Sequence, residues 1–297
     1  MQKHRTRAIC TAVLAVALAA LGLAGSAQAK LTGNYTKFAQ CPFSNTEVSK
    51  CLYSTTESGE VVLGSKKVPI VNPVVLQGGY GKQVGGISPF FGATNGVTLS
   101  KAAQPVPGGL AGLVNCKEIS EPFLRFACEL TFENGLTGLN ATLELAKPAS
   151  EIKISELNLV AEEGVALKMP VKMHLENPFL GSSCYVGSSS SPIIWNLTSG
   201  ETSPPEPNKT ILGSAGTFKL LEEGRILEAT GTKLVDNAWS APGASGCGGF
   251  LVELVLDPII NAASGLPAAA GHNTAILNNK IFLGSAQAVR ENNAANP

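Results

Sequence analysis

The clearest pattern in the chain is a strict alternation of apolar and polar positions over residues 165–176, written VALKMPVKMHLE. The apolar positions are Val165, Leu167, Met169, Val171, Met173 and Leu175. The positions between them hold Lys168, Pro170, Lys172 and His174. A period of two residues predicts a half-buried antiparallel strand. Proline and lysine on the outer face further predict that this strand lies at the edge of its sheet.

Shorter apolar and β-branched runs predict further strands. A tight hairpin is predicted from Gly59 onward, where two apolar runs are separated by Gly64 and Ser65. A second turn is predicted at residues 222–224, which are Glu222, Glu223 and Gly224. The other expected strands cover residues 74–77, 141–145, 152–160, 193–197, 217–221, 225–230 and 275–283. Short strands at hairpin spacing predict a mainly β fold, an antiparallel sandwich or barrel-like sheets with one or two short helices.

Two segments have helical spacing. Residues 250–265 place apolar side chains at i, i+3 and i+4, with Gly265 where a helix would end, although Asp257 and Pro258 also fit the start of a shorter helix after a strand. Residues 120–135 form the second candidate, with Ser120 as the N-cap and Gly135 as the terminator.

The first 29 residues have the features of a secretory signal peptide. Lys3, Arg5 and Arg7 precede an apolar run over residues 8–23, and small residues end in Ala29. We expect cleavage between Ala29 and Lys30, because the apolar run is shorter than the roughly 20 residues that a membrane-spanning helix needs. Residues 30–297 would then form a secreted mainly β domain, with a possible internal boundary near residues 147–151, that is extracellular or associated with the cell envelope.

Cysteine usage agrees with export. Outside the leader the chain has six cysteines, an even number that predicts three disulfides, although six cysteines allow fifteen pairings. Proximity favours pairing Cys41 with Cys51 and Cys116 with Cys128, which leaves Cys184 with Cys247. The short paired spacings typical of zinc ligands are absent from these cysteines, so we expect no metal site.

Charge and candidate chemistry are sparse. Charged residues make up 15% of the chain, against about 25% in typical domains, and positive and negative side chains balance at 22 each, which gives no reason to expect a nucleic-acid partner. The only histidines and aspartates after the leader are His174, His272, Asp236 and Asp257. His174 is interpreted as a solvated side chain and His272 as a loop residue, and no cofactor is expected.

Other candidates have simpler structural interpretations. Gly187 and the four serines of residues 188–191 lack the second glycine of a nucleophile elbow, so this stretch is interpreted as a surface loop anchored by Cys184. The pair Glu162 and Glu163, like the pair at residues 222–223, precedes a glycine and is typical of a solvated turn rather than of glycoside hydrolysis. Two tryptophans, Trp195 and Trp239, are expected in the core rather than on a carbohydrate-binding face. No catalytic residue is assigned.

Several segments resemble a family of uncharacterised exported proteins from high-GC Gram-positive bacteria. They include CPFSNTEVSKCLYS, KVPIVNPVVLQGG, FENGLTG, NPFLGSSCYVGSSSSPI and LTSGETSPPEPNK. The resemblance implies bacterial export, and it brings no known activity, cofactor or partner with it. It would make the four NxS/T matches at Asn34, Asn140, Asn196 and Asn208 chance occurrences rather than glycan acceptors.

These observations favour a secreted, non-catalytic binding or structural protein of the cell envelope or extracellular space, with an unassigned ligand. A cell-wall or envelope component is a possible partner, and the oligomeric state stays open. Two alternatives remain: a secreted hydrolase that uses Glu or Ser, and a lipid-binding or pore-forming envelope protein.

Overall fold

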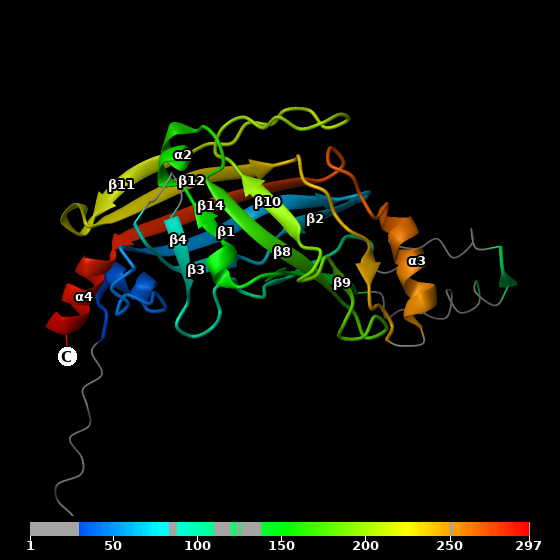
Figure 1. The fold of residues 1–297 in the computed structure, drawn as a ribbon, viewed down its shortest axis with the longest axis horizontal. Helices are drawn as coiled ribbons and strands as arrows, with labels where there is room; N and C mark the ends of the chain where they lie inside the picture. Colours follow the sequence, from blue (N-terminus) through cyan, green and yellow to red (C-terminus); the bar gives the residue numbers. More distant parts are fainter. Residues whose placement is uncertain are drawn as a thin grey trace, which may run out of the picture.

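The computed structural model describes residues 30–82, 88–109, 120–122, 125, 138–249 and 252–296. These residues form a mainly β fold, as predicted (Figure 1). The strands are β1 (Lys50–Leu63), β2 (Lys66–Ile70), β3 (Val74–Tyr80), β4 (Ser88–Gly92), β5 (Ala103–Pro105), β6 (Asn140–Leu145), β7 (Lys153–Ile154), β8 (Leu167–Glu176), β9 (Tyr185–Val186), β10 (Ile193–Leu197), β11 (Thr217–Leu221), β12 (Ile226–Asp236), β13 (Ala244–Ser245) and β14 (Thr274–Ser285).

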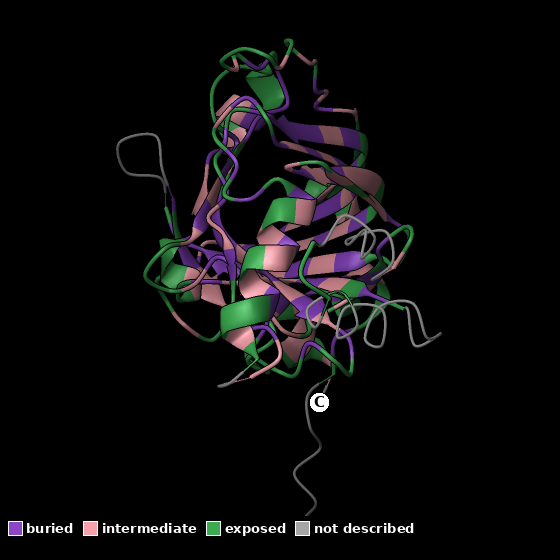
Figure 2. Cartoon of the chain, turned by 90° about the vertical axis from the view of Figure 1, so that its right-hand side faces the viewer, coloured by how far each residue is buried: buried purple, intermediate pink, exposed green. Residues whose placement is uncertain are grey.

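All fourteen strands belong to one open antiparallel sheet. Its order is β11-β12-β14-β1-β3-β4-β7-β8-β6-β5, while β2 pairs with β1, β10 and β9 pair with β8, and β13 pairs with β9. The part built on β1, β12 and β14 and the part built on β8 share one hydrophobic core, in which Leu277 of β14 and Val171 of β8 are both buried. The arrangement is therefore sandwich-like, and Figure 2 shows buried and intermediate segments alternating along its strands behind a helix.

The longest strand, β1, changes partners along its length. Residues 50–56 pair with β3 and residues 59–63 pair with β2, and a register shift in the β14 pairing falls between Thr56 and Ser58. Gly59 follows the shift with φ +140°, and a Cβ there would lie 2.0 Å from the carbonyl oxygen of Ile276. Only glycine fits this close approach. The shift gives β1 two partners on one side and a continuous partner, β14, on the other.

The alternation over residues 165–176 correctly predicts β8, but the prediction of an edge strand is wrong. Met169, Val171, Met173 and Leu175 are buried, as the pattern requires. Residues 167–168 lie between β7 and β10, and residues 173–174 lie between β6 and β9. Pro170 is accommodated where β8 passes from one set of partners to the next, and its carbonyl accepts a hydrogen bond from the Ala146 backbone N–H.

The described helices are η1 (Gly33–Phe38), η3 (Ala149–Glu151), α2 (Glu156–Ala161), η4 (Glu222–Gly224), α3 (Glu253–Ser264) and α4 (Ala286–Ala295). Helix α3 confirms the predicted helix over Glu253–Ser264, with Gly265 in the left-handed conformation at its end, and Pro258 lies inside it rather than at its start. The strand expected over 152–160 is wrong beyond Ile154, because Ser155 caps α2 by accepting from the Asn158 N–H. Helix α4 was not predicted, and the candidate helix at 120–135 lies almost entirely outside the described residues.

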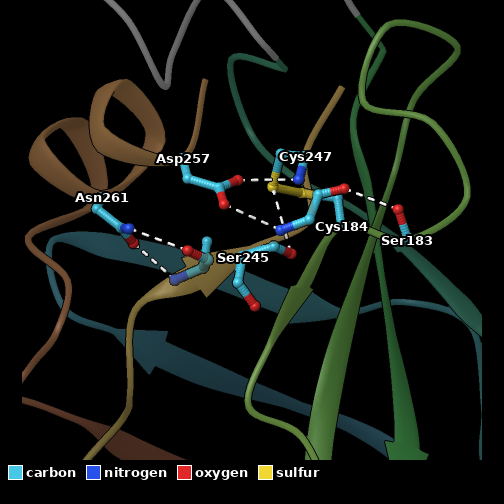
Figure 3. Close-up of a disulfide and its surroundings, with 8 residues drawn as sticks. Ser183, Cys184, Ser245, Cys247, Asp257 and Asn261 are labelled. Carbon is cyan, nitrogen blue, oxygen red and sulfur yellow. Dashed lines mark hydrogen bonds between the residues drawn. A yellow bond between two sulfur atoms is a disulfide. The ribbon is translucent and has the colours of Figure 1, made fainter. Parts of the chain in front are cut away.

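The described part of the chain contains two disulfides, Cys41–Cys51 and Cys184–Cys247, and both agree with the expected pairing. The third expected pair, Cys116 and Cys128, lies outside the described residues. Around Cys184–Cys247 the side chain of Asp257 accepts hydrogen bonds from the backbone N–H groups of Gly246 and Cys247 (Figure 3). One turn further along α3, Asn261 bonds both backbone groups of Ala244. The disulfide, β13 and α3 therefore form one connected unit.

Across the described part of the chain, every helix is too short or too polar to cross a lipid bilayer.

Candidate functional site: an apolar cavity between the two parts of the sheet

A cavity lies between the two parts of the sheet. Its walls come from β1, β2, β3, β12 and β14 in one part and from β5, β6, β8 and β10 in the other. The cavity has a volume of about 70 Å³ and opens to solvent. Of its 20 lining residues, 16 are apolar. Protein interiors are otherwise packed as closely as organic crystals, so this is a distinct feature of the fold.

Strand alternation brings these side chains together. Leu167, Met169 and Met173 occupy alternate or nearby inward positions of β8, and Leu143 and Ala141 do the same on β6. Because successive strand residues point to opposite faces, the pattern over residues 165–176 identifies part of the lining from sequence. It gives no sign that the facing side chains leave space between them.

The polar groups that line the cavity are largely satisfied by the protein. The Thr56 hydroxyl donates to Asn279 Oδ1 at 2.7 Å, and Asn279 Nδ2 donates to the Leu277 carbonyl at 2.8 Å. Gln104 bonds four backbone groups around residues 71, 72 and 102. The described lining contains no ionisable side chain.

Trp195 is the exception. Its side chain lines the cavity and is fully buried, and its indole Nε1 has no hydrogen-bond partner among the described residues. A buried N–H without an acceptor costs about 1–3 kcal/mol. The neighbouring Trp239 is also buried, as expected for both tryptophans, but its Nε1 donates to the Asp236 carbonyl at 3.2 Å.

Two smaller apolar cavities adjoin the central one. The first shares Ser54, Leu76, Leu167 and Leu234 with it and reaches Ser155 at the start of α2. A second shares Leu63, Val68, Ala141 and Met173 with it and reaches Ser264 and Leu266 at the end of α3. Figure 1 shows α2 above the strands and α3 at their right-hand end. The three apolar cavities therefore adjoin one another through shared lining residues between these two helices.

Each smaller cavity has one ionisable residue in its lining. At the α2 end, Glu156 pairs with Lys50 and accepts a hydrogen bond from the Tyr80 hydroxyl. Burial raises the pKa of Tyr80 well above its ordinary value, and the charge of Glu156 adds to this effect. At the α3 end, burial lowers the pKa of Lys66. Among the described lining residues, the ionisable side chains therefore belong to the two smaller cavities and not to the central one.

The outer face of β8 carries a second group of polar side chains. His174 stacks on Tyr185 with ring centroids 4.4 Å apart, and its Nδ1 lies 3.1 Å from Glu176 Oε1. With a side chain only 15% exposed, His174 is not the solvated residue expected from the sequence, because β9 places Tyr185 against it. Burial opposes ionisation of Glu144, but its hydrogen bond and charge pairing with Lys101, together with Lys172, hold its pKa below the ordinary value.

The remaining sequence candidates lie apart from one another. His272 is exposed, as expected. The serines at 188–191 bond among themselves, with the Ser191 N–H donating to Ser188 Oγ at 3.0 Å, in a surface loop. Glu162 and Glu222 occupy turns with positive φ, and each carboxylate accepts a backbone hydrogen bond, from Ala215 and Asn34 respectively. No group of three potential metal ligands occurs within the described ranges.

No protein-family model, curated protein or solved structure matches the chain.

Proposed function

We propose that the protein is an exported, non-catalytic binding protein of the cell envelope or extracellular space, and that it holds an apolar ligand in the central cavity. The observation that carries the proposal is the cavity itself, with its 16 apolar lining residues and no charged group among those described. The leader at residues 1–29 and the two disulfides support export.

The energetic argument starts from the cost of empty space. At about 24 cal/mol per Å³, a cavity of 70 Å³ lowers stability by about 2 kcal/mol. Water would lose hydrogen bonds on entering, because such a site offers it few partners, and dry apolar cavities take up small apolar molecules. A ligand that fills the space recovers dispersion contacts with the lining.

The shape of the space favours an elongated ligand. The central cavity shares lining residues with a neighbour that reaches α2 and with another that reaches α3, and within the described lining the ionisable side chains belong to these two neighbours. A chain-like apolar molecule, such as an acyl or other hydrocarbon chain, matches this arrangement better than a compact polar one. This supports the lipid-binding interpretation of an envelope protein.

A fluorescence titration with the uncharged apolar probe N-phenyl-1-naphthylamine tests the proposal. Ala141 lies where the central and α3-end cavities meet, so Ala141→Leu adds three carbons to the space that the probe needs. We expect saturable binding to the wild-type protein and at least about a tenfold loss of affinity in Ala141→Leu. The matched control, Ala295→Leu, adds the same atoms at an exposed position of α4 and should bind as wild type.

Equal, unsaturable fluorescence in all three proteins would contradict the proposal. A folded Ala141→Leu protein, shown by unchanged far-ultraviolet circular dichroism, is required for the comparison. If that variant does not fold, displacement of the probe by octane from the wild-type protein gives the same test, because octane competes only for an apolar site.

A further inference from the structure

The unpartnered indole N–H of Trp195 gives information about the ligand. Trp195 is fully buried in β10, lines the central cavity, and has no acceptor for Nε1 among the described residues. Buried indole N–H groups are normally hydrogen-bonded. A donor on a side chain that lines a cavity can take its acceptor from the molecule that fills the cavity.

The surrounding polar groups do not supply that acceptor. Thr56 and Asn279 bond each other, and Gln104 is occupied by backbone groups. Trp239 packs against Trp195 edge to face, with ring centroids 6.1 Å apart, and its own N–H is already bonded to the Asp236 carbonyl. Trp195 therefore holds a buried donor, without an acceptor among the described residues, on a side chain that lines this apolar space.

The type of acceptor follows from the absence of charge in the described lining. A carboxylate or phosphate in the central cavity would lose its hydration and meet no cation there, which is far more costly than burying a neutral oxygen. A ketone, ester or alcohol oxygen accepts one hydrogen bond and needs no counter-ion. Its hydrocarbon part would occupy the rest of the apolar space.

We propose that the ligand is an uncharged chain-like molecule with a single neutral oxygen, and that this oxygen accepts a hydrogen bond from Trp195 Nε1. The inference rests on the proposed function, because it assigns chemistry to the ligand of the same cavity. Trp195 is then the residue that distinguishes an oxygen-bearing chain from a plain hydrocarbon.

The test compares 2-octanone with octane as competitors of N-phenyl-1-naphthylamine. Trp195→Phe removes the donor and changes the space for both competitors, so only their affinity ratio reports the hydrogen bond. We expect the octanone-to-octane affinity ratio to fall about fivefold in Trp195→Phe, the effect of one neutral hydrogen bond. Ser54→Ala reports whether the oxygen contacts this lining hydroxyl instead, and the control Ser190→Ala, which removes an exposed hydroxyl outside the cavity, should leave the ratio unchanged.

A spectroscopic measurement on Trp239→Phe gives a second readout. Trp195 is then the only indole in the chain. With 2-octanone bound, its ¹H–¹⁵N signal should lie downfield of its position in the octane-bound protein. If Trp239→Phe does not fold, the wild-type protein gives the same readout with two indole signals.

The outcomes separate the two proposals. If neither octane nor 2-octanone displaces the probe, the proposed function is wrong. If both bind but the ratio is the same in wild type and Trp195→Phe and the indole signal does not respond to the ketone, the Trp195 inference is overturned and the apolar site stands. A ratio that falls in Ser54→Ala instead would also overturn it, since the oxygen would then contact Ser54.

Discussion

Trp195 and Trp239 pack edge to face, with ring centroids 6.1 Å apart and ring planes 63° apart, yet among the described residues only Trp239 finds a partner for its indole N–H. Trp239 follows β12 and bonds the carbonyl of Asp236, three residues earlier. Trp195 lies at the centre of β10 and lines the cavity. The two buried tryptophans therefore have different roles. Trp239 packs the loop that follows β12, and Trp195 lines the candidate site.

This difference predicts unequal effects of the same substitution on stability. Trp239→Phe breaks a hydrogen bond and leaves the Asp236 carbonyl without it, whereas Trp195→Phe removes a donor that has no partner. Both lose part of the indole packing. We expect Trp239→Phe to lower the free energy of unfolding by about 1 kcal/mol more than Trp195→Phe. Urea unfolding of the ligand-free proteins measures this difference, and equal losses would contradict it.

The Cys184–Cys247 disulfide should contribute more than the shorter one. It closes a loop of 63 residues, against 10 residues for Cys41–Cys51. On the loop-entropy model the two contribute about 4 and 3 kcal/mol. Chemical denaturation of the Cys184→Ala/Cys247→Ala and Cys41→Ala/Cys51→Ala double variants checks the order. If the Cys184→Ala/Cys247→Ala variant unfolds at the same denaturant concentration as wild type, the prediction is wrong and the contacts of α3 with β13 suffice to hold this region.

Asp236 provides a pH prediction. It is 4% exposed, and burial raises its pKa above 3.8, although hydrogen bonds from the Ala238 and Asn196 backbones act in the opposite direction. The Asp236 carboxylate therefore binds its proton more tightly in the folded protein than in the unfolded chain. The resulting contribution to stability is complete below about pH 4 and is lost as the pH rises through the raised pKa.

Carbon-13 NMR of aspartate carboxyl groups tests this directly, because Asp236 and Asp257 are the only two aspartates in the chain. The Asp236→Asn variant assigns the two signals. We expect the Asp236 signal to titrate with a midpoint above 3.8, and wild type to lose stability relative to Asp236→Asn as the pH rises from about 4. A midpoint at or below 3.8 would contradict this account.

Local patterns in the sequence predict much of the fold. Alternation identifies β8 and its buried side chains, glycine and serine identify the turn between β1 and β2, and Gly265 marks the end of α3. These features depend on residues close together in the chain. The sequence similarly predicts two disulfide pairings that the structure contains.

Features that depend on distant segments were missed. β8 was expected at an edge because of Pro170 and its lysines, but β6, β7, β9 and β10 flank it from other parts of the chain. His174 was expected in solvent, but Tyr185 stacks on it. The cavity depends on how far apart two facing layers stand, which no local pattern records. Trp195 was expected in the core without any sign that its N–H lacks a partner.

The methionines offer the most direct test of the central claim. The chain has three, and the two outside the leader, Met169 and Met173, both line the central cavity. In protein labelled with ¹³C at the methionine methyl groups, titration with 2-octanone should shift both of these signals with one saturation curve, while Met1, if retained, stays unchanged. Methyl signals of Met169 and Met173 that do not respond at saturating ligand would contradict the assignment of this cavity as the binding site.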